Sequence, residues 1–253
     1  MRIRFFTLLL LLCWLPSMAA AVELSDIVTA LETPFRPLSG QGQAIHDFQA
    51  NFFQESHIAS IERTQRGQGV VSFRFQQRPN SDQPLTMFRW EYREPLVQQF
   101  ISDGQTMWVY EPENRQVVET DISEIGLQQS NNPIAFLNRL GFLSQDFEVS
   151  WAAPATDQGK NYILELQPRE ESQFIRRLLI VVARKAVSDY IENDKIGQVF
   201  PILATTVYDL KGNRTSIEFA ETRINQQLSG DFFYFERPEG VEVVRPTSEQ
   251  LGF

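Results

Sequence analysis

The sequence predicts an exported, mainly β protein in which a curved antiparallel sheet carries too few helices to fill its concave face. Three observations lead to this prediction: an export signal, a succession of short alternating strands, and only two well-marked helices. In the clearest strand, rings alternate with charges: Phe88, Trp90 and Tyr92 against Arg89 and Glu91. Side chains alternate between the two faces of a strand, so one sheet face is built from rings and the other from charges.

Residues 1–21 predict a secretory signal peptide. They begin with two arginines, continue with an apolar run over residues 5–15 and end in Ala-x-Ala at residues 19–21. This apolar run is too short to span a membrane. Cleavage leaves 232 residues without cysteine, because Cys13 lies in the removed segment. Residues 22–253 then form a single domain held by its core rather than by disulfides, as in many periplasmic proteins.

The charge balance is acidic. The formal net charge of −9 becomes −11 when residues 1–21 and their two arginines are removed. This balance argues against a nucleic-acid partner and against electrostatic docking on anionic lipid.

The helices and strands are predicted in the following order. A short amphipathic helix covers residues 24–31 and ends before Pro34. A second helix covers residues 133–140, where Asn132 suits the N-cap and Gly141 suits the end. Strands are predicted over residues 48–52, 71–75, 87–92, 98–102, 106–110, 147–151, 162–166, 178–182, 202–208, 215–219 and 232–235. Residues 183–198 predict a surface insertion with some helix.

Catalytic motifs are scarce. His46 and His57 are not part of a metal-spacing pair, and no nucleophile elbow or phosphate-binding loop is present. The acidic pairs, Glu170–Glu171 and Glu192 with Asp194, lie in polar segments that offer no burial to shift a pKa. We therefore expect no enzymatic activity, no cofactor and no metal.

The aromatic rows allow two interpretations. Each row can pack against a helix as ordinary core, or it can line an apolar pocket. Many ring-bearing strands, few helices and export together favour a pocket in the concave face of the sheet.

Several sequence blocks occur in the order and spacing of a known family. They are DFQANFFQ at 47–54, GQG at 67–69, RPN at 78–80, FRWEY at 88–92, ISDGQTMWVYEP at 101–112, QV at 116–117, NPIAFL at 132–137 and FYFERPEGVEV at 233–243. The chain resembles the LolA family, the periplasmic carriers that take lipoproteins from the inner to the outer membrane.

This resemblance implies an incomplete antiparallel β-barrel, a half-barrel, with short helices lying as a lid over its apolar concave face. It implies a cavity for lipoprotein acyl chains, lined by Phe73, Phe88, Trp90, Tyr92, Trp108, Ile134 and Leu137. It also implies that an arginine holds the empty lid closed by hydrogen bonds to lid carbonyls. That arginine is Arg78, with Arg89 as the alternative, because an apparent insertion at residues 81–86 separates two of the blocks.

The implied partners are lipoprotein acyl chains as cargo, an inner-membrane release complex of the ABC-transporter type and an outer-membrane lipoprotein receptor. A periplasmic monomer without cofactor is expected. The main alternative is an exported lipid- or glycolipid-binding protein with the same half-barrel. An exported hydrolase and a structural or adhesive protein are weaker alternatives. The chain departs from the family pattern at residues 183–198, which replace a tight turn, and in its acidic tail.

Overall fold

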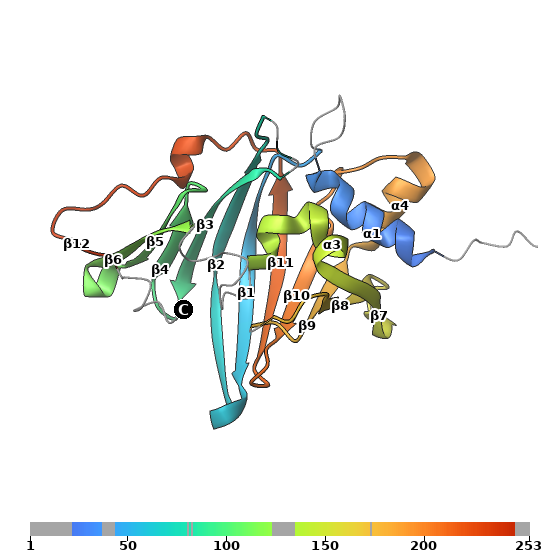
Figure 1. Ribbon diagram of the computed structural model, residues 1–253, viewed down its shortest axis with the longest axis horizontal. Helices are drawn as coiled ribbons and strands as arrows, with labels where there is room; N and C mark the ends of the chain where they lie inside the picture. The colour runs from blue at the N-terminus through green and yellow to red at the C-terminus, as the bar shows by residue number, and fades with distance from the viewer. Residues whose placement is uncertain are drawn as a thin grey trace, which may run out of the picture.

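A computed structural model describes residues 22–36, 44–79, 81, 83–122, 135–172 and 174–245, and shows one long curved sheet with helices on its concave side (Figure 1). The sheet has twelve strands in the order β12-β6-β5-β4-β3-β2-β1-β11-β10-β9-β8-β7. Neighbouring strands are antiparallel except for β12, which runs parallel to β6. The strands β7 and β12 form its two edges, so the sheet is open and the predicted incomplete barrel is confirmed.

The strands follow the predicted alternation closely. Their bounds are β1 Asp47–Ile58, β2 Arg63–Gln76, β3 Leu85–Glu94, β4 Gln98–Ser102, β5 Thr106–Glu111, β6 Gln116–Asp121, β7 Phe147–Thr156, β8 Tyr162–Pro168, β9 Arg177–Val182, β10 Ile202–Tyr208, β11 Arg214–Ile224 and β12 Glu242–Val244. In β3, Phe88 and Trp90 are buried in the main core, whereas Arg89 and Glu91 are half-buried. One face of β3 therefore carries rings and the other carries charges.

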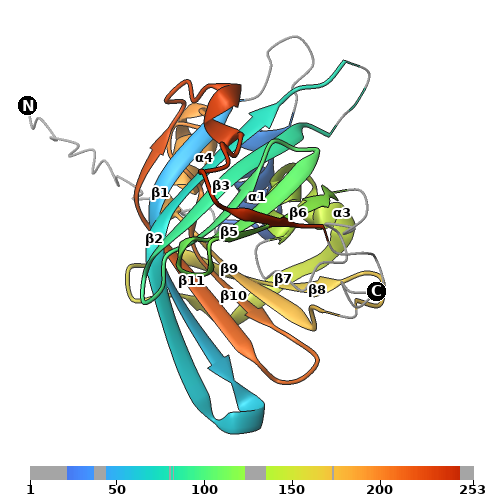
Figure 2. The same cartoon turned by 90° about the vertical axis from the view of Figure 1, so that its left-hand side faces the viewer.

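The structure contains several short helices, and some of them cover the concave face. Their bounds are α1 Leu24–Glu32, η1 Thr33–Phe35, η2 Ala59–Ile61, η3 Pro112–Asn114, η4 Ala135–Phe142, α3 Leu143–Asp146, α4 Arg184–Asn193 and η5 Gly230–Phe233. Figure 2 shows the sheet curling so that α1 and α3 lie within its hollow. None of the helices in the described ranges is long and apolar enough to cross a membrane.

Three predicted elements differ from the structure or extend beyond it. Residues 232–235, predicted as a strand, belong to the 3₁₀ helix η5 and the extended segment after it. The second helix is described from Ala135 onward, and Asn132 and Pro133 lie outside the described residues. The expected surface insertion contains α4, whose Val187 is 1 % exposed within the main core, so this segment is part of the fold.

Candidate functional site

The rings predicted to line a cavity form the centre of the main hydrophobic core. Phe73 on β2 lies directly opposite Phe88 on β3, and their ring centroids are 5.8 Å apart. On β1, Phe48 stacks on Phe73 at 5.1 Å and Phe52 lies 4.6 Å from Trp90. All of them are buried. Three adjacent strands therefore present a continuous aromatic surface to the concave side.

This aromatic surface ends in polar groups. Tyr92, the third ring of β3, is half-buried, and its hydroxyl donates a hydrogen bond of 2.7 Å to Oε1 of Gln54. Burial raises the pKa of Tyr92 to about 12, so it stays a neutral donor. The indole N–H of Trp90 is buried near the Tyr92 hydroxyl, where it opposes the rise in the pKa of Tyr92, and no described residue accepts a hydrogen bond of normal geometry from it.

Two helical segments cover the aromatic surface and occupy its hollow. Ile27 and Leu31 of α1, with Phe35 of η1, belong to the same buried cluster as the rings, and Phe35 lies 5.3 Å from Phe75. Leu137 of η4 is fully buried in the cluster too, beside Phe136 and Leu140. The structure thus brings Phe73, Phe88, Trp90 and Leu137 together, with Tyr92 packed at their margin. Ile134 lies outside the described residues.

Trp108 does not join this group, which corrects the prediction that it lines the same cavity. It belongs to a second cluster with Ile101, Val117, Phe235 and Val241, on the convex side of the sheet. Its ring lies 5.3 Å from Tyr234, and its indole N–H donates to Glu119 at 3.2 Å. The cause is strand parity: Met107, not Trp108, packs against the main core.

The contacts of Arg89 with described residues lie away from the helical cover. Arg89 shares the convex face with the segment after β11, donates to the carbonyl of Phe232 at 3.0 Å and lies over the Phe232 ring at 5.3 Å. Arg78 is exposed, and its described hydrogen bonds go to Ser81 and to the carbonyl of Gln83 in its own turn. Because residues 123–134 lie outside the described ranges, the assignment of the latch to Arg78, with Arg89 as the alternative, stays a prediction.

A different arginine contacts a carbonyl of the helical cover. Arg36, just after η1, donates through Nε to the carbonyl of Gly141 in η4 and forms an ion pair with Glu32. Glu32, 2 % exposed, also accepts hydrogen bonds from the backbone N–H and the hydroxyl of Ser144, the latter at 3.0 Å. The guanidinium groups of Arg36 and Arg139 both lie over the Phe142 ring, at 5.6 and 5.7 Å. We call Glu32, Arg36, Gly141 and Ser144 the inter-helix cluster.

The inter-helix cluster holds two covering segments together by close packing and by a buried, hydrogen-bonded carboxylate. A built Cβ on Gly141 would lie 3.0 Å from Cγ of Arg36 and 3.3 Å from its backbone nitrogen, so the two segments approach closely at this glycine and a side chain there would have to push them slightly apart. Burial raises the pKa of Glu32, a change opposed by its bonds to Ser144 and by the charge of Arg36. Sequence reasoning missed this cluster, yet one signal was available: Glu32 follows Val28 by four residues and so falls on the apolar stripe of α1.

A cleft of about 530 Å³ opens beside the inter-helix cluster. Leu24, Val28 and Val149 supply its apolar lining, and Arg36 and Arg169 supply its cations. Among the residues with described positions, no group of His, Cys, Asp or Glu side chains is placed to hold a metal ion. His57 lies within β1, with its Nδ1 3.4 Å from the hydroxyl of Thr64.

Fold and site together define a class of protein: an open antiparallel sheet whose aromatic concave face lies under a helical cover. The sequence model of the outer membrane lipoprotein carrier protein LolA matches residues 43–236, and the chain belongs to this family.

Relatives named outer-membrane lipoprotein carrier protein are similar along most of their length. The one from Hahella chejuensis is 27% identical over 209 residues, covering 82% of this chain and 86% of that protein. The one from Legionella pneumophila strain Paris is 26% identical over 217 residues, covering 85% of this chain and 91% of that protein.

Among solved structures, a LolA-superfamily protein from Nitrosomonas europaea aligns with a TM-score of 0.43 at 14% identity, covering 85% of this chain and 99% of that one. An uncharacterised protein from Thermus thermophilus aligns with a TM-score of 0.47 at 15% identity, covering 88% and 98%.

Proposed function

We propose that this protein is a periplasmic carrier that binds the acyl chains of lipoproteins released from the inner membrane and delivers them to the outer membrane. The observation that carries this proposal is the aromatic surface of Phe73, Phe88 and Trp90 beneath helices that fill its hollow with their own side chains. Family membership supports lipoprotein as the cargo. The carrier performs no reaction and uses no cofactor.

In the proposed mechanism, hydrocarbon and helical cover compete for one surface. Burying an acyl chain gains roughly 0.8 kcal/mol per CH₂, so a sixteen-carbon chain gains about 12 kcal/mol gross. Binding that strong without an opposing cost would prevent release. Loading must displace Leu31, Phe35 and Leu137 from the rings, and this lost packing opposes the gain.

The inter-helix cluster sets part of that opposing cost. When the α1–η1 segment separates from η4 and α3, the bond from Arg36 to the Gly141 carbonyl and the two bonds from Ser144 to Glu32 are lost. When it closes, Glu32 returns to a site where its charge is compensated by Arg36 and Ser144. The cluster therefore favours the closed, empty form and promotes release of cargo.

Arg78 is a second latch candidate, because the family resemblance assigns lid hydrogen bonds to the arginine of its Arg-Pro-Asn block. If it acts as that latch, Arg78→Leu accepts lipoprotein and fails to pass it on. Normal transfer by this variant would show that Arg78 does not hold the cover closed. Arg36 would then be the arginine that does so.

The proposed partners are an ABC-type release complex in the inner membrane and a lipoprotein receptor at the outer membrane. The test is to incubate the purified protein with inner-membrane vesicles that hold a labelled triacylated lipoprotein, the release complex from the same bacterium, and ATP. Soluble label that migrates with the protein supports the carrier. Label that stays in the vesicles contradicts it and favours the exported lipid- or glycolipid-binding alternative.

A further inference from the structure

Two hairpins project together beyond the rest of the sheet. The strand β3 ends opposite Gln68, whereas β1 and β2 continue to their turn at residues 59–62. The turn between β10 and β11, residues 209–213, reaches the same place, because His57 pairs with Arg214. The backbone N–H of Ala59 donates to Oδ1 of Asn213 at 3.0 Å and joins the two turns. We call residues 58–63 and 209–213 the hairpin tip, seen at the bottom of Figures 1 and 2.

Each turn of the hairpin tip exposes one large aliphatic side chain. Ile61 is 61% exposed and Leu210 is 59% exposed. Turns in water-soluble regions normally carry small or polar residues, so two aliphatic chains at adjoining turns require an explanation. The fold does not need them as core, since the main hydrophobic cluster ends at Phe52 on β1 and Ile217 on β11.

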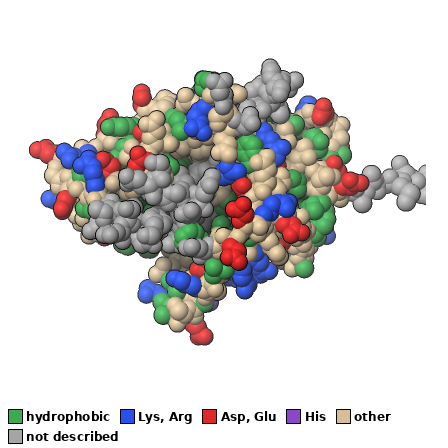
Figure 3. Space-filling view, viewed as in Figure 1, with side chains coloured by type: hydrophobic (Ala, Val, Ile, Leu, Met, Phe, Trp, Pro, Cys, Tyr) green, Lys and Arg blue, Asp and Glu red, His purple; other side chains and the backbone are tan. Residues whose placement is uncertain are grey.

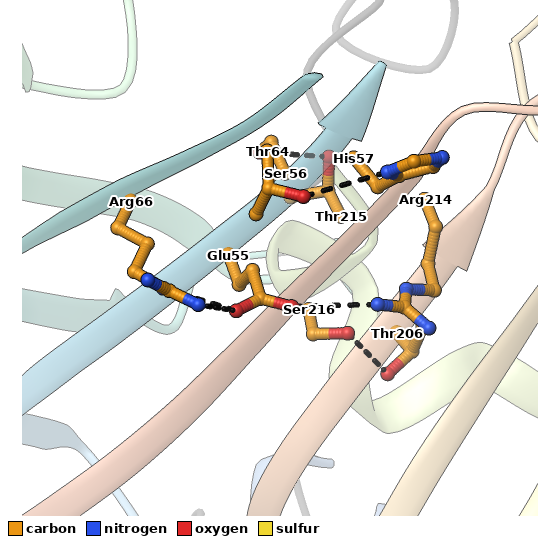
Figure 4. Close-up of polar contacts among 9 residues, drawn as sticks. All are labelled: Glu55, Ser56, His57, Thr64, Arg66, Thr206, Arg214, Thr215 and Ser216. Carbon is orange, nitrogen blue, oxygen red and sulfur yellow. Dashed lines mark hydrogen bonds and ion pairs between the residues drawn. The ribbon is translucent and has the colours of Figure 1, made fainter. Parts of the chain in front are cut away.

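Polar contacts support the outer ends of the hairpins that end in the tip, beyond Val207 and Ile217, the core residues of β10 and β11 nearest to it. Figure 4 shows Ser56 with Thr215 at 3.1 Å and Thr206 with Ser216 at 3.0 Å across neighbouring strands. Glu55 lies between two guanidinium groups, 3.1 Å from Arg66 and 3.4 Å from Arg214. The hairpins thus have a hydrogen-bonded framework of their own, and the aliphatic chains at its end are free to contact something else.

The charges around the tip differ from those of the whole chain. Residues 55–66 and 209–214 carry four cations against three acids, whereas the full chain has a net charge of −9. Glu55 is paired with Arg66 and Arg214, Asp209 accepts bonds from the backbone N–H groups of Lys211 and Asn213, and Glu62 is exposed between Ile61 and Arg63. Arg63 and Lys211 are exposed beside the aliphatic chains. Figure 3 shows Lys and Arg side chains on this projecting end.

We propose that the hairpin tip inserts Ile61 and Leu210 into the headgroup region of a phospholipid bilayer, with Arg63 and Lys211 facing lipid phosphates. Aliphatic chains flanked by long cationic side chains suit a membrane interface, where the chain enters and the cation stays with the headgroups. This local arrangement outweighs the expectation, based on the acidic total, that the protein avoids anionic lipid. The inference does not depend on the proposed cargo.

Flotation with vesicles of phosphatidylethanolamine and phosphatidylglycerol tests this proposal. The wild-type protein is expected to float with the vesicles, and the double variant Ile61→Ser/Leu210→Ser is expected to lose on the order of tenfold in bound fraction. The matched control is Ile191→Ser, which removes a 46% exposed aliphatic chain from α4 and should float like the wild type. The charge variant Arg63→Glu/Lys211→Glu should lose binding when phosphatidylglycerol is present.

Three results would overturn the proposal: a wild-type protein that does not float, a double variant that floats as well as the wild type, or an equal loss in Ile191→Ser. Circular dichroism of each variant shows whether it remains folded, and all substituted side chains are exposed. Vesicle binding and lipoprotein release are separate readouts. If the protein floats with the vesicles but releases no lipoprotein, the result supports membrane insertion by the hairpin tip and contradicts the carrier proposal.

Discussion

Glu32 and Ser144 lie 112 positions apart in the chain, and both oxygens of the Glu32 carboxylate accept hydrogen bonds from Ser144. One bond comes from the backbone N–H and the other from the hydroxyl. Arg36 completes the contact by pairing with Glu32 and donating to the Gly141 carbonyl. Through these bonds the first helix is fixed to η4 and α3, the segments that cover the aromatic surface.

Removal of Arg36 should loosen the cover. Arg36→Leu leaves Glu32 buried without its cation and removes the bond to Gly141, at an expected cost of about 1–3 kcal/mol in unfolding free energy. Amide hydrogen exchange over residues 135–146 should speed up. Arg66→Leu, which removes an exposed ion pair on β2, is the control and should leave that exchange unchanged. Equal exchange in both variants would show that Arg36 does not hold the cover.

The stability contributed by Glu32 should depend on pH in a defined direction. Burial raises the pKa of Glu32 above 4.5 in the folded protein, with Arg36 and Ser144 opposing the shift and Asp146, itself paired with Arg139, adding to it. Between the pKa of Glu32 in the unfolded chain, about 4.5, and its raised pKa in the folded protein, the folded protein binds more protons than the unfolded chain. The unfolding free energy therefore falls as pH rises through this window.

Urea unfolding of the wild type and Glu32→Gln across a pH series checks this direction. As pH is lowered from 7 into the window, the wild type should gain stability relative to Glu32→Gln, which does not titrate at this position. A difference that stays constant, or one that moves the opposite way, would mean that Glu32 is not desolvated in solution.

Trp90 should be the most costly single ring to remove. It is fully buried, so Trp90→Ala is expected to lower the unfolding free energy by about 3–5 kcal/mol. Trp90→Phe should cost much less, because it keeps most of the ring volume and removes a buried indole N–H that finds no acceptor of normal geometry among the described residues. Trp151→Ala, at a 39% exposed position on β7, is the control, with an expected loss below about 1 kcal/mol.

Gly69 should not tolerate a side chain. A Cβ at this position would lie 1.8 Å from the carbonyl oxygen of Glu91, at an irregularity in the β2–β3 register. Gly69→Ala should therefore destabilise the protein by about 1–3 kcal/mol or more, as judged from chemical unfolding. Gly230→Ala provides the comparison, since nothing lies within 4 Å of its built Cβ and little change is expected.

Strand alternation predicted most of this fold because each strand turns one face to the core. In β3, for example, the rings are buried on one side only. Phe88 and Trp90 needed no tertiary information to be placed on the core face. The same logic fails at residues 232–235, where consecutive rings are equally compatible with a strand and with η5 packing against the convex side. Trp108 was misplaced because it lies two strands away from β3, and the sequence does not show which residues of β5 share the face of Phe88 and Trp90.

The inter-helix cluster shows the other limit of sequence reasoning. Glu32 on an apolar stripe signals a buried carboxylate, but its partner Ser144 is more than a hundred residues away. Only the fold brings the two together. The arginine implied by family resemblance, Arg78, and the arginine seen on a cover carbonyl, Arg36, therefore need separate tests.

The most direct test of the central claim asks which tryptophan an acyl chain touches. Two variants of residues 22–253 are prepared, both with Trp151 replaced by Phe. One also carries Trp108→Phe and keeps Trp90, and the other carries Trp90→Phe and keeps Trp108. Each is loaded with an acylated lipopeptide whose chains carry bromine, a short-range quencher of indole fluorescence. The account predicts quenching of Trp90, on the concave face, and unchanged fluorescence of Trp108, on the convex face. Quenching of Trp108 with Trp90 unaffected would contradict it.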